Sequence, residues 1–197
     1  MNEREVFRRL EEMERKFLGK RSKSPLPVLF IDRERKVYVA KQNGEFLDPY
    51  GWERIEVVFL KRYYGYYKKE GGRIVRTPLL DEYFRKPDEG FKPEAVFVVF
   101  VPSLGVLSWR VRGLALGKLV EAFRREPPSY KKVYVLGISE VSWESEGKVF
   151  SLPVPELIYV RPIKTEEALK LLQSREKLEE FHRYVMGYDD EDLDIDF

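Results

Sequence analysis

Residues 95 to 101 read Ala-Val-Phe-Val-Val-Phe-Val, an unbroken apolar run rich in β-branched and aromatic side chains. Successive side chains of a strand point to opposite faces of its sheet, so a strand of this composition is apolar on both faces. We therefore predict a central strand that is buried on both sides. Any fold of this chain must then place packing layers on both faces of one sheet.

Further extended patterns lie before and after this strand. Val28 to Ile31 is apolar, and Lys36 to Lys41 alternates after a polar turn, as expected of a β-hairpin. Val106 to Arg112 alternates as well. Other predicted strands are 55–60 and 73–77, followed by a β-meander over 132–138, 140–143, 149–152 and 157–160. These patterns predict a mainly β domain with flanking helices.

One helical pattern interrupts the strands. Residues 113–125 place Leu116, Leu119 and Phe123 on one side of a helix. An OB-fold, a small five-stranded β-barrel, inserts a helix at this place, between its third and fourth strands. We therefore expect an OB-fold-like small β-barrel with an internal helix.

Two longer helical patterns lie near the ends of the chain. Val6, Leu10, Met13 and Phe17 form one apolar stripe over residues 2–18, which we expect to pack on the body. A second helix is predicted to begin at Thr165 and to end at Gly187. We divide the chain into an N-terminal helix with a basic loop (1–24), an OB-like nucleic-acid-binding domain (25–163), a C-terminal helix (164–187) and an acidic tail (188–197).

The tail, Tyr188 to Phe197, contains six carboxylates and no basic side chain. Such a segment cannot bury enough apolar surface to fold alone, so we predict a disordered acidic tail. Near its end, Leu193, Ile195 and Phe197 alternate with aspartates. This pattern suits insertion of a terminal ring and its carboxylate into a basic-rimmed pocket on a partner.

The tail resembles the acidic tip of single-stranded DNA-binding proteins of bacteria and many phages, a carboxylate run that finishes in Phe. Asp194-Ile195-Asp196-Phe197 is similar to the bacterial tip, except that Asp196 stands where bacteria usually place Pro. The resemblance covers about ten residues. It implies that the chain coats single-stranded DNA and recruits replication, recombination or repair enzymes through the tip. The implied partner-binding residues are Asp192, Asp194, Ile195, Asp196 and Phe197.

The body departs from the bacterial type. It has neither the amino-terminal strand signature nor a long linker rich in Gly and Gln before the tip. This difference favours a viral, phage or plasmid origin and leaves assembly open, including a homo-oligomer. With 36% charged residues and only two Asn and two Gln, the composition is typical of a thermophile.

Charge supports an anionic ligand for the body. The whole chain has 36 basic and 34 acidic residues, a formal net charge of +2. Without the six acids of the tail, 28 acidic residues face 36 basic ones, so the body carries about +8. A basic body with an acidic tail indicates that the tail competes with the anionic ligand.

Residues 61–69 are the strongest candidate for nucleic-acid contact, because four tyrosines stand there among four basic residues, with a single glycine in the middle. Interleaved rings and cations suit a surface that stacks bases and neutralises phosphates. The alternative is a twisted hairpin whose tyrosines cover a hydrophobic edge. The candidate residues here are Lys61, Arg62, Tyr63, Tyr64, Tyr66, Tyr67, Lys68 and Lys69.

Two other places supply candidates. The alternation after residue 105 puts Arg110 and Arg112 on one face of a sheet, with Trp109 beside them. Tyr38 next to Lys36 is a possible base-stacking position on its strand, and Trp52 lies in or beside a loop. A Tyr in a strand is, however, as well explained by simple β packing.

The sequence offers little for catalysis. It has no Cys, and its one histidine, His182, lies among charged residues of a helix where we expect it to be solvated. Gly113 to Leu119 is similar to a nucleotide-binding loop, but it has the wrong glycine spacing and no hydroxyl after Lys118. Asp32 and Glu34 could serve a magnesium nuclease, although charged residues are usual in such a turn. We predict no enzyme, no cofactor and no metal site.

Two further functions remain open. An RNA-binding module would use the same aromatic and basic surface, and a protein-interaction adaptor would use the tail alone. No apolar run approaches the ~18 residues that span a bilayer, and the start has no signal-peptide layout, so we expect a soluble cytoplasmic protein with no membrane partner.

Overall fold

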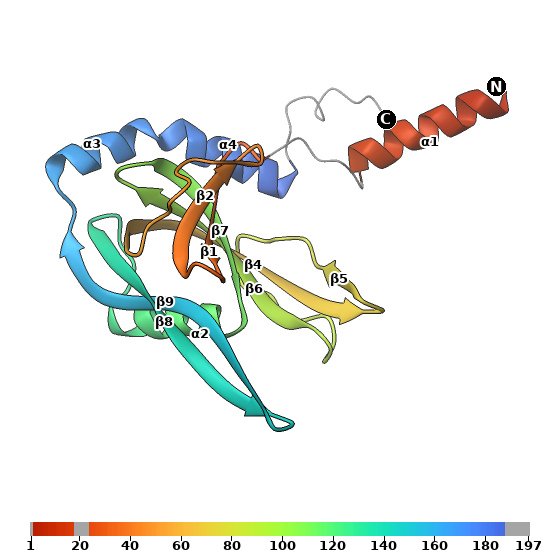
Figure 1. Ribbon diagram of the computed structural model, residues 1–197. Coiled ribbons are helices and arrows are strands. Elements are labelled where there is room, and N and C mark those ends of the chain that lie inside the picture. Colours follow the sequence, from red (N-terminus) through yellow and green to blue (C-terminus); the bar gives the residue numbers. More distant parts are fainter. Residues whose placement is uncertain (1, 18–23, 188–197) are drawn as a thin grey trace.

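The computed structural model describes residues 2–17 and 24–187. Its helices are α1 (Glu3–Phe17), α2 (Gly113–Arg125), α3 (Thr165–Gln173) and α4 (Arg175–Met186). Its strands are β1 (Val28–Asp32), β2 (Val37–Gln42), β3 (Glu45–Phe46), β4 (Ile55–Glu70), β5 (Arg73–Arg76), β6 (Lys92–Val101), β7 (Gly105–Arg112), β8 (Lys132–Ser145) and β9 (Lys148–Pro162). The described chain is mainly β with flanking helices, as predicted (Figure 1).

The nine strands form one mixed sheet. Its order is β3-β2-β1-β7-β6-β4-β8-β9, and β5 pairs with the far end of β4. Among the described strands, β1 and β7 alone run parallel, through the pairs Val28 with Ser108 and Leu29 with Trp109. No ladder joins β3 to β9 in the described chain, so the strands do not close into the small barrel that we expected. The β1–β2 hairpin occupies the edge of β7 that a closing strand would need.

The central strand predicted at 95–101 is confirmed as part of β6. It lies between β7 and β4, and every residue from 94 to 101 is buried. Ala95 and Phe97 point into one hydrophobic cluster, the inner core, whereas Val96 and Val98 point into another, the outer core. One strand therefore contributes to two packing layers on opposite faces of the sheet.

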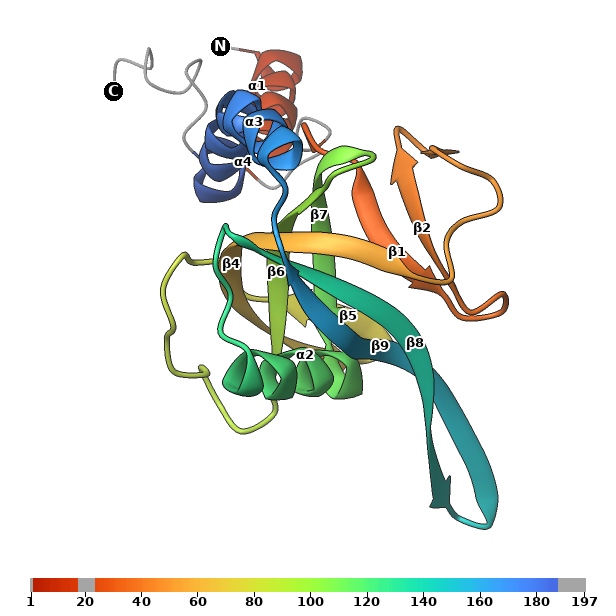
Figure 2. The same ribbon diagram turned by 90° about the vertical axis from the view of Figure 1, so that its left-hand side faces the viewer.

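The sheet curls around the inner core (Figure 2). The Phe59 ring lies 4.8 Å from Phe123 and 5.2 Å from Tyr134, measured between centroids, and both contacts are edge-to-face. Curling brings β2 close to β8, where the Tyr38 hydroxyl donates to the Gly137 carbonyl at 2.7 Å. The predicted helix at 113–125 is confirmed as α2, which packs on this core.

The outer core is covered by α4. Phe181 of α4 is 3% exposed and belongs to this core. A hydrogen bond of 2.8 Å joins Nδ1 of the neighbouring His182 to the Tyr63 hydroxyl. We expected a solvated His182, but its side chain is half-buried and hydrogen-bonded to the sheet.

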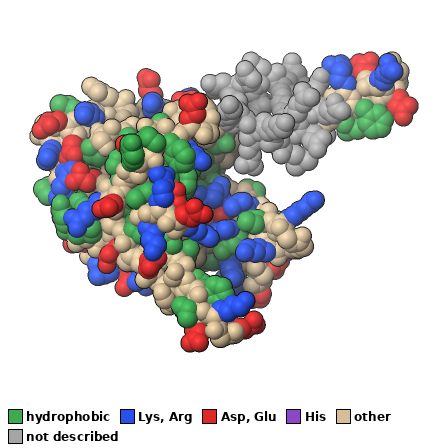
Figure 3. All heavy atoms as spheres, viewed as in Figure 1, with side chains coloured by type: hydrophobic (Ala, Val, Ile, Leu, Met, Phe, Trp, Pro, Cys, Tyr) green, Lys and Arg blue, Asp and Glu red, His purple; other side chains and the backbone are tan. Residues whose placement is uncertain are grey.

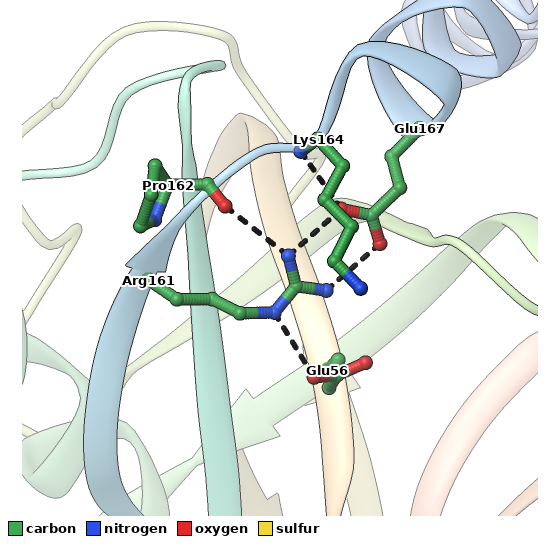
Figure 4. A network of polar contacts seen from close by, with 5 residues as sticks. All are labelled: Glu56, Arg161, Pro162, Lys164 and Glu167. Carbon is green, nitrogen blue, oxygen red and sulfur yellow. Dashed lines mark hydrogen bonds and ion pairs between the residues drawn. The ribbon is translucent and has the colours of Figure 1, made fainter.

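Arg161 of β9 fixes the start of α3 on the sheet (Figure 4). Its guanidinium donates to the Glu167 carboxylate at 2.7 and 2.8 Å and to Glu56 of β4 at 3.1 Å. The backbone N–H of Lys164 also donates to Glu167, at 2.9 Å. These donors, Arg161 above all, lower the pKa of Glu167 to about 2. Because α4 follows α3 directly, the network also helps to position α4.

The C-terminal helix predicted from Thr165 to Gly187 is in fact two helices. They meet at Ser174, whose hydroxyl donates to the Lys170 carbonyl at 2.9 Å. Such a side-chain bond competes with the helical pattern and favours a break. Gly187 has a φ of 74° and ends α4, which confirms the predicted end.

The predicted meander over 132–160 is a single hairpin of two long strands, β8 and β9, turning at Glu146 and Gly147. The predicted gap between 152 and 157 is wrong, because Pro153 and Pro155 lie inside β9. β9 is the last strand of the sheet, and an edge strand tolerates proline since one side of its backbone needs no donors.

The N-terminal helix forms within its predicted range but does not pack on the sheet in the part described. Val6, Phe7 and Leu10 of α1 are 41%, 57% and 50% exposed. Figure 1 shows α1 apart from the strands. In the described residues, no helix is long and apolar enough to cross a membrane.

Candidate nucleic-acid interface

An open basic face lies on the outer side of β7, β6, β4 and β5. Cross-strand neighbours share a face of a sheet, and the register places Arg112 beside Glu94 and Tyr67 beside Arg76. Alternate residues of these strands therefore project from the same side. Figure 3 shows Lys and Arg side chains gathered over this part of the molecule. We call basic face the set Tyr67, Arg76, Lys92, Arg110 and Arg112.

A buried carboxylate holds two of these arginines. Glu94 is 1% exposed, and its Oε1 lies 2.7 Å from Nη1 of Arg110 and 3.3 Å from Nε of Arg76. Both arginine side chains are 39% exposed, so they present further N–H donors to solvent. Glu94 thus links β5 to β7 from its position on β6 between them.

Gly65 of β4 makes room for this arrangement. A Cβ at this position would lie 2.8 Å from Cδ2 of Leu79 and 3.6 Å from Cγ of Glu94. Any larger residue would push Leu79 and would crowd the Glu94 side chain that bridges towards β5. The single glycine within the tyrosine-rich sequence therefore serves the ion-pair cluster.

Arg112 has a different environment. Its guanidinium carbon lies 4.8 Å from the centroid of the Tyr67 ring. Its Nη1 is buried and has no hydrogen-bond partner, and no carboxylate pairs with it in the described chain. Arg112 therefore presents a positive charge that no acid of the described chain neutralises, and the Tyr67 ring lies next to it.

A groove of about 370 Å³ adjoins the basic face. Arg76 and Arg110 line it together with Ser108, and Phe181 and Val185 of α4 line it as well. The groove thus joins cationic donors to an apolar wall. Such a mixture suits a ligand with anionic groups and flat apolar rings, as in a nucleic acid strand.

Four aromatic residues predicted to contact nucleic acid belong to the hydrophobic interior. Tyr38 and Tyr63 have no exposed surface, and Trp109 and Tyr66 are 3% and 6% exposed. Burial raises the pKa of Tyr63 to about 12. A ring without an exposed face offers no surface on which a base could stack, so these four residues are not part of the interface considered below. Trp52 is half-buried against the inner core.

The predicted cluster over residues 61–69 is divided between two faces of the sheet. β4 carries a bulge between Phe59 and Lys61. Tyr67 lies on the basic face, whereas Arg62 and Tyr64 project from the opposite face with Phe97. One ligand on one face cannot contact all of these residues.

Two of the predicted lysines have acidic partners at hydrogen-bonding distance, and a third, Lys61, has Asp81 at 4.0 Å. Lys36 Nζ lies 2.7 Å from Glu140, and Lys68 Nζ lies 2.9 Å from Glu70. Their charge is partly used inside the protein, so they are weaker candidates for phosphate contact than Arg112. Lys61 is half-buried and Lys69 is exposed. The partner-binding residues predicted at 192–197 lie outside the described residues.

Sequence analysis missed Arg76, Lys92 and Glu94. The turn at 102–104 fixes the register of β6 and β7, so that Glu94 falls opposite Arg112. Likewise, the turn at Gly71-Gly72 places Arg76 opposite Tyr67. Both pairings could therefore have been predicted from the turn signals in the sequence.

Other chemistry finds no support in the described residues. No group of three or more His, Asp or Glu side chains there could hold a metal ion. Asp32, considered above for a nuclease, caps its own turn by accepting the N–H groups of Glu34 and Arg35 at 3.0 and 3.1 Å. These hydrogen bonds, that of Arg35 first, lower the pKa of Asp32.

Comparison with protein-family models, with curated proteins and with solved structures finds no match for this chain.

Proposed function

We propose that this protein binds single-stranded DNA, with little sequence preference, through the basic face. The observation that carries the proposal is the alignment of Arg76, Arg110 and Arg112 on one open side of the sheet, with Tyr67 beneath Arg112. Guanidinium groups bind phosphate oxygens with two donors at once. An aromatic ring stacks on any base, since all bases have a π-face.

The charge of the cluster favours an anion. The face carries three guanidinium groups and one buried carboxylate, Glu94, which pairs with Arg76 and Arg110 but not with Arg112, so two positive charges remain. The body outside the acidic tail carries about +8, which adds attraction at long range.

The order of the strands supports a relation to the OB-fold. β4, β6, β7, α2, β8 and β9 follow one another as five strands with a helix after the third, apart from the short β5, and β4 pairs with both β6 and β8. OB-folds bind oligonucleotides on the face of their second and third strands. On this assignment those strands are β6 and β7, which carry Lys92, Arg110 and Arg112. The β1–β2 hairpin, which precedes β4 in the chain, is then an N-terminal addition that keeps the barrel open.

The acidic tail has two roles in this proposal. It recruits replication, recombination or repair proteins through Asp192 to Phe197, and it competes with DNA for the basic face. The second role is supported by position, because Tyr184 and Val185 line the groove and α4 ends at Gly187. Ten further residues at ~3.3 Å each can reach ~33 Å, far enough to cover the groove.

The test is a fluorescence titration of the full chain with oligothymidine, with a duplex and with RNA of the same length. We expect much tighter binding of single-stranded DNA than of duplex at moderate salt. Tighter binding of RNA than of single-stranded DNA would favour an RNA-binding module. No retention on single-stranded DNA at low salt would contradict the proposal and favour a protein-interaction adaptor.

A further inference from the structure

A second pocket, of about 290 Å³, opens on the side of β4 opposite the basic face. It lies between β4 and the end of α2, and its lining includes Arg62, Tyr64, Phe97, Phe123 and Pro128. Its volume is close to the ~300 Å³ at the lower end of small-molecule sites. Nothing in the basic face accounts for this pocket.

Arg62 is a cation without an acidic partner in the described chain. Its guanidinium carbon lies 4.5 Å from the Tyr64 ring centroid and 5.7 Å from that of Phe97. Its Nε is buried and has no hydrogen-bond partner. A half-buried cation with unused donors is costly unless an anion compensates it. An anionic group bound in the pocket would therefore stabilise the Arg62 side chain.

The rest of the lining is aromatic. The rings of Phe97 and Phe123 meet edge-to-face with centroids 5.6 Å apart, and Phe123 is only half-buried. They offer an apolar surface next to the Arg62 donors. Lys61 also borders the pocket, but its ammonium group lies over the Tyr63 ring on the other face of β4. The ligand that fits these features has a flat ring and an anionic group.

We propose that this pocket binds one nucleotide, with its phosphate on Arg62 and its base against the phenylalanine rings. The nucleotide is either free or part of a longer single strand. The second source rests on the proposed function, because the strand must then also occupy the basic face. The pocket thus lies beyond the groove and extends the binding site of the protein to the opposite side of β4.

The experiment uses the full chain and three probes: thymidine 5′-monophosphate, a hexathymidine and a 20-residue oligothymidine. The ring NMR signals of Tyr64, Phe97 and Phe123 report on the pocket, and affinities are measured beside them. Arg62→Gln is compared with Arg175→Gln, which changes an arginine that is 82% exposed on α4. Removal of one charged phosphate contact should weaken the ligand in the pocket by about tenfold. The melting temperature should change little, since Arg62 has no hydrogen-bond or ion-pair partner in the described chain and loses the ring contacts with Tyr64 and Phe97 alone.

Shifts of the pocket rings by the monophosphate, lost in Arg62→Gln, support a site for a free nucleotide. Shifts by the 20-residue strand alone, with a tenfold loss for that strand but none for hexathymidine, support a nucleotide of a strand. Binding of the monophosphate without any binding of oligonucleotides would keep the pocket and contradict the proposed function. If oligonucleotides bind wild type and Arg62→Gln equally, and no probe shifts the ring signals of the pocket, the nucleotide site in the pocket is contradicted. The proposed function would then still stand. A lower melting temperature with unchanged affinities would give Arg62 a purely structural role.

Discussion

Nη1 of Arg110 lies 2.7 Å from Oε1 of Glu94, and that carboxylate has no exposed surface. A surface cation is therefore anchored from below by an acid that solvent does not reach. Because Arg76 shares the same carboxylate from β5, on the far side of β4, two guanidinium groups are held at a fixed spacing on the open sheet. Fixed donors lose less side-chain entropy when a phosphate binds, which favours a role for Glu94 in positioning the basic face.

Replacement of Glu94 by Gln should destabilise the protein. The change keeps the shape but removes the charge that both arginines share, at a cost of about 1 to 2 kcal/mol. For a chain of this size we expect the melting temperature to fall by about 2 to 8 °C, measured by circular dichroism. Glu89→Gln, at a side chain that is 96% exposed, should leave it unchanged. Equal melting of the two variants would mean that the cluster contributes nothing to stability.

Stability at acid pH should depend on Glu167. Its pKa is lowered to about 2 in the folded protein, from 4.5 when unperturbed, chiefly by Arg161. A depressed pKa stabilises the folded state above pH ~4.5, and this contribution is lost as the pH falls from about 4.5 towards 2. The difference in urea midpoint between wild type and Glu167→Gln should therefore shrink over that range. A difference in urea midpoint that stays constant from pH 6 to 2.5 would contradict the lowered pKa of Glu167. Glu166→Gln, at an exposed side chain of the same helix, is the control.

The sequence predicts those parts of the fold that depend on local pattern. The two-sided burial of β6, the span of α2 and the shared face of Arg110 and Arg112 follow from periodicity alone. A short turn also fixes the register of each hairpin, which is why Glu94 could have been placed beside Arg112. These features need no knowledge of distant contacts.

What could not be predicted depends on pairing between distant segments. The alternation around Tyr38 is correct, but nothing local shows which face of that strand turns to the inner core, where the Tyr38 ring is fully buried. The bulge after Phe59 changes the faces of the following tyrosines, and it exists only in the pairing of β4 with β6. Tyr63 is likewise buried because α4, which is distant in the sequence, packs over it.

Tyr67 should supply a stacking surface. Loss of a stacked ring costs about 1 to 3 kcal/mol, so Tyr67→Ala should weaken hexathymidine binding by roughly 5- to 150-fold. Tyr67→Phe keeps the ring and should bind as the wild type does. Tyr64→Ala changes the same residue type on the opposite face of β4 and should leave hexathymidine binding intact. If Tyr67→Ala and Tyr64→Ala weaken this short strand equally, the division of the cluster between two faces does not matter for binding.

Deletion of Tyr188 to Phe197 should tighten binding of single-stranded DNA at low salt. The tail adds six carboxylates at high effective concentration beside the groove, and its removal ends that competition. Salt should reduce the difference, because screening weakens both attractions. Removal of Phe197 alone should leave DNA affinity unchanged and weaken partner binding. Unchanged affinity after the full deletion, measured by titration below physiological ionic strength, would refute competition.

The central claim, that Arg76 and Arg112 neutralise phosphates on one open face, is tested most directly by the salt dependence of oligothymidine binding. On single strands the slope of log affinity against log salt is about −0.7 per neutralised phosphate. The variant Arg76→Gln/Arg112→Gln, in which Arg110 keeps its contact with Glu94, should bind more weakly with a slope less steep by about 1.4. Arg73→Gln, on the opposite face of β5 by alternation, should retain the wild-type slope. A double variant with wild-type affinity and wild-type slope would show that the basic face does not bind the strand.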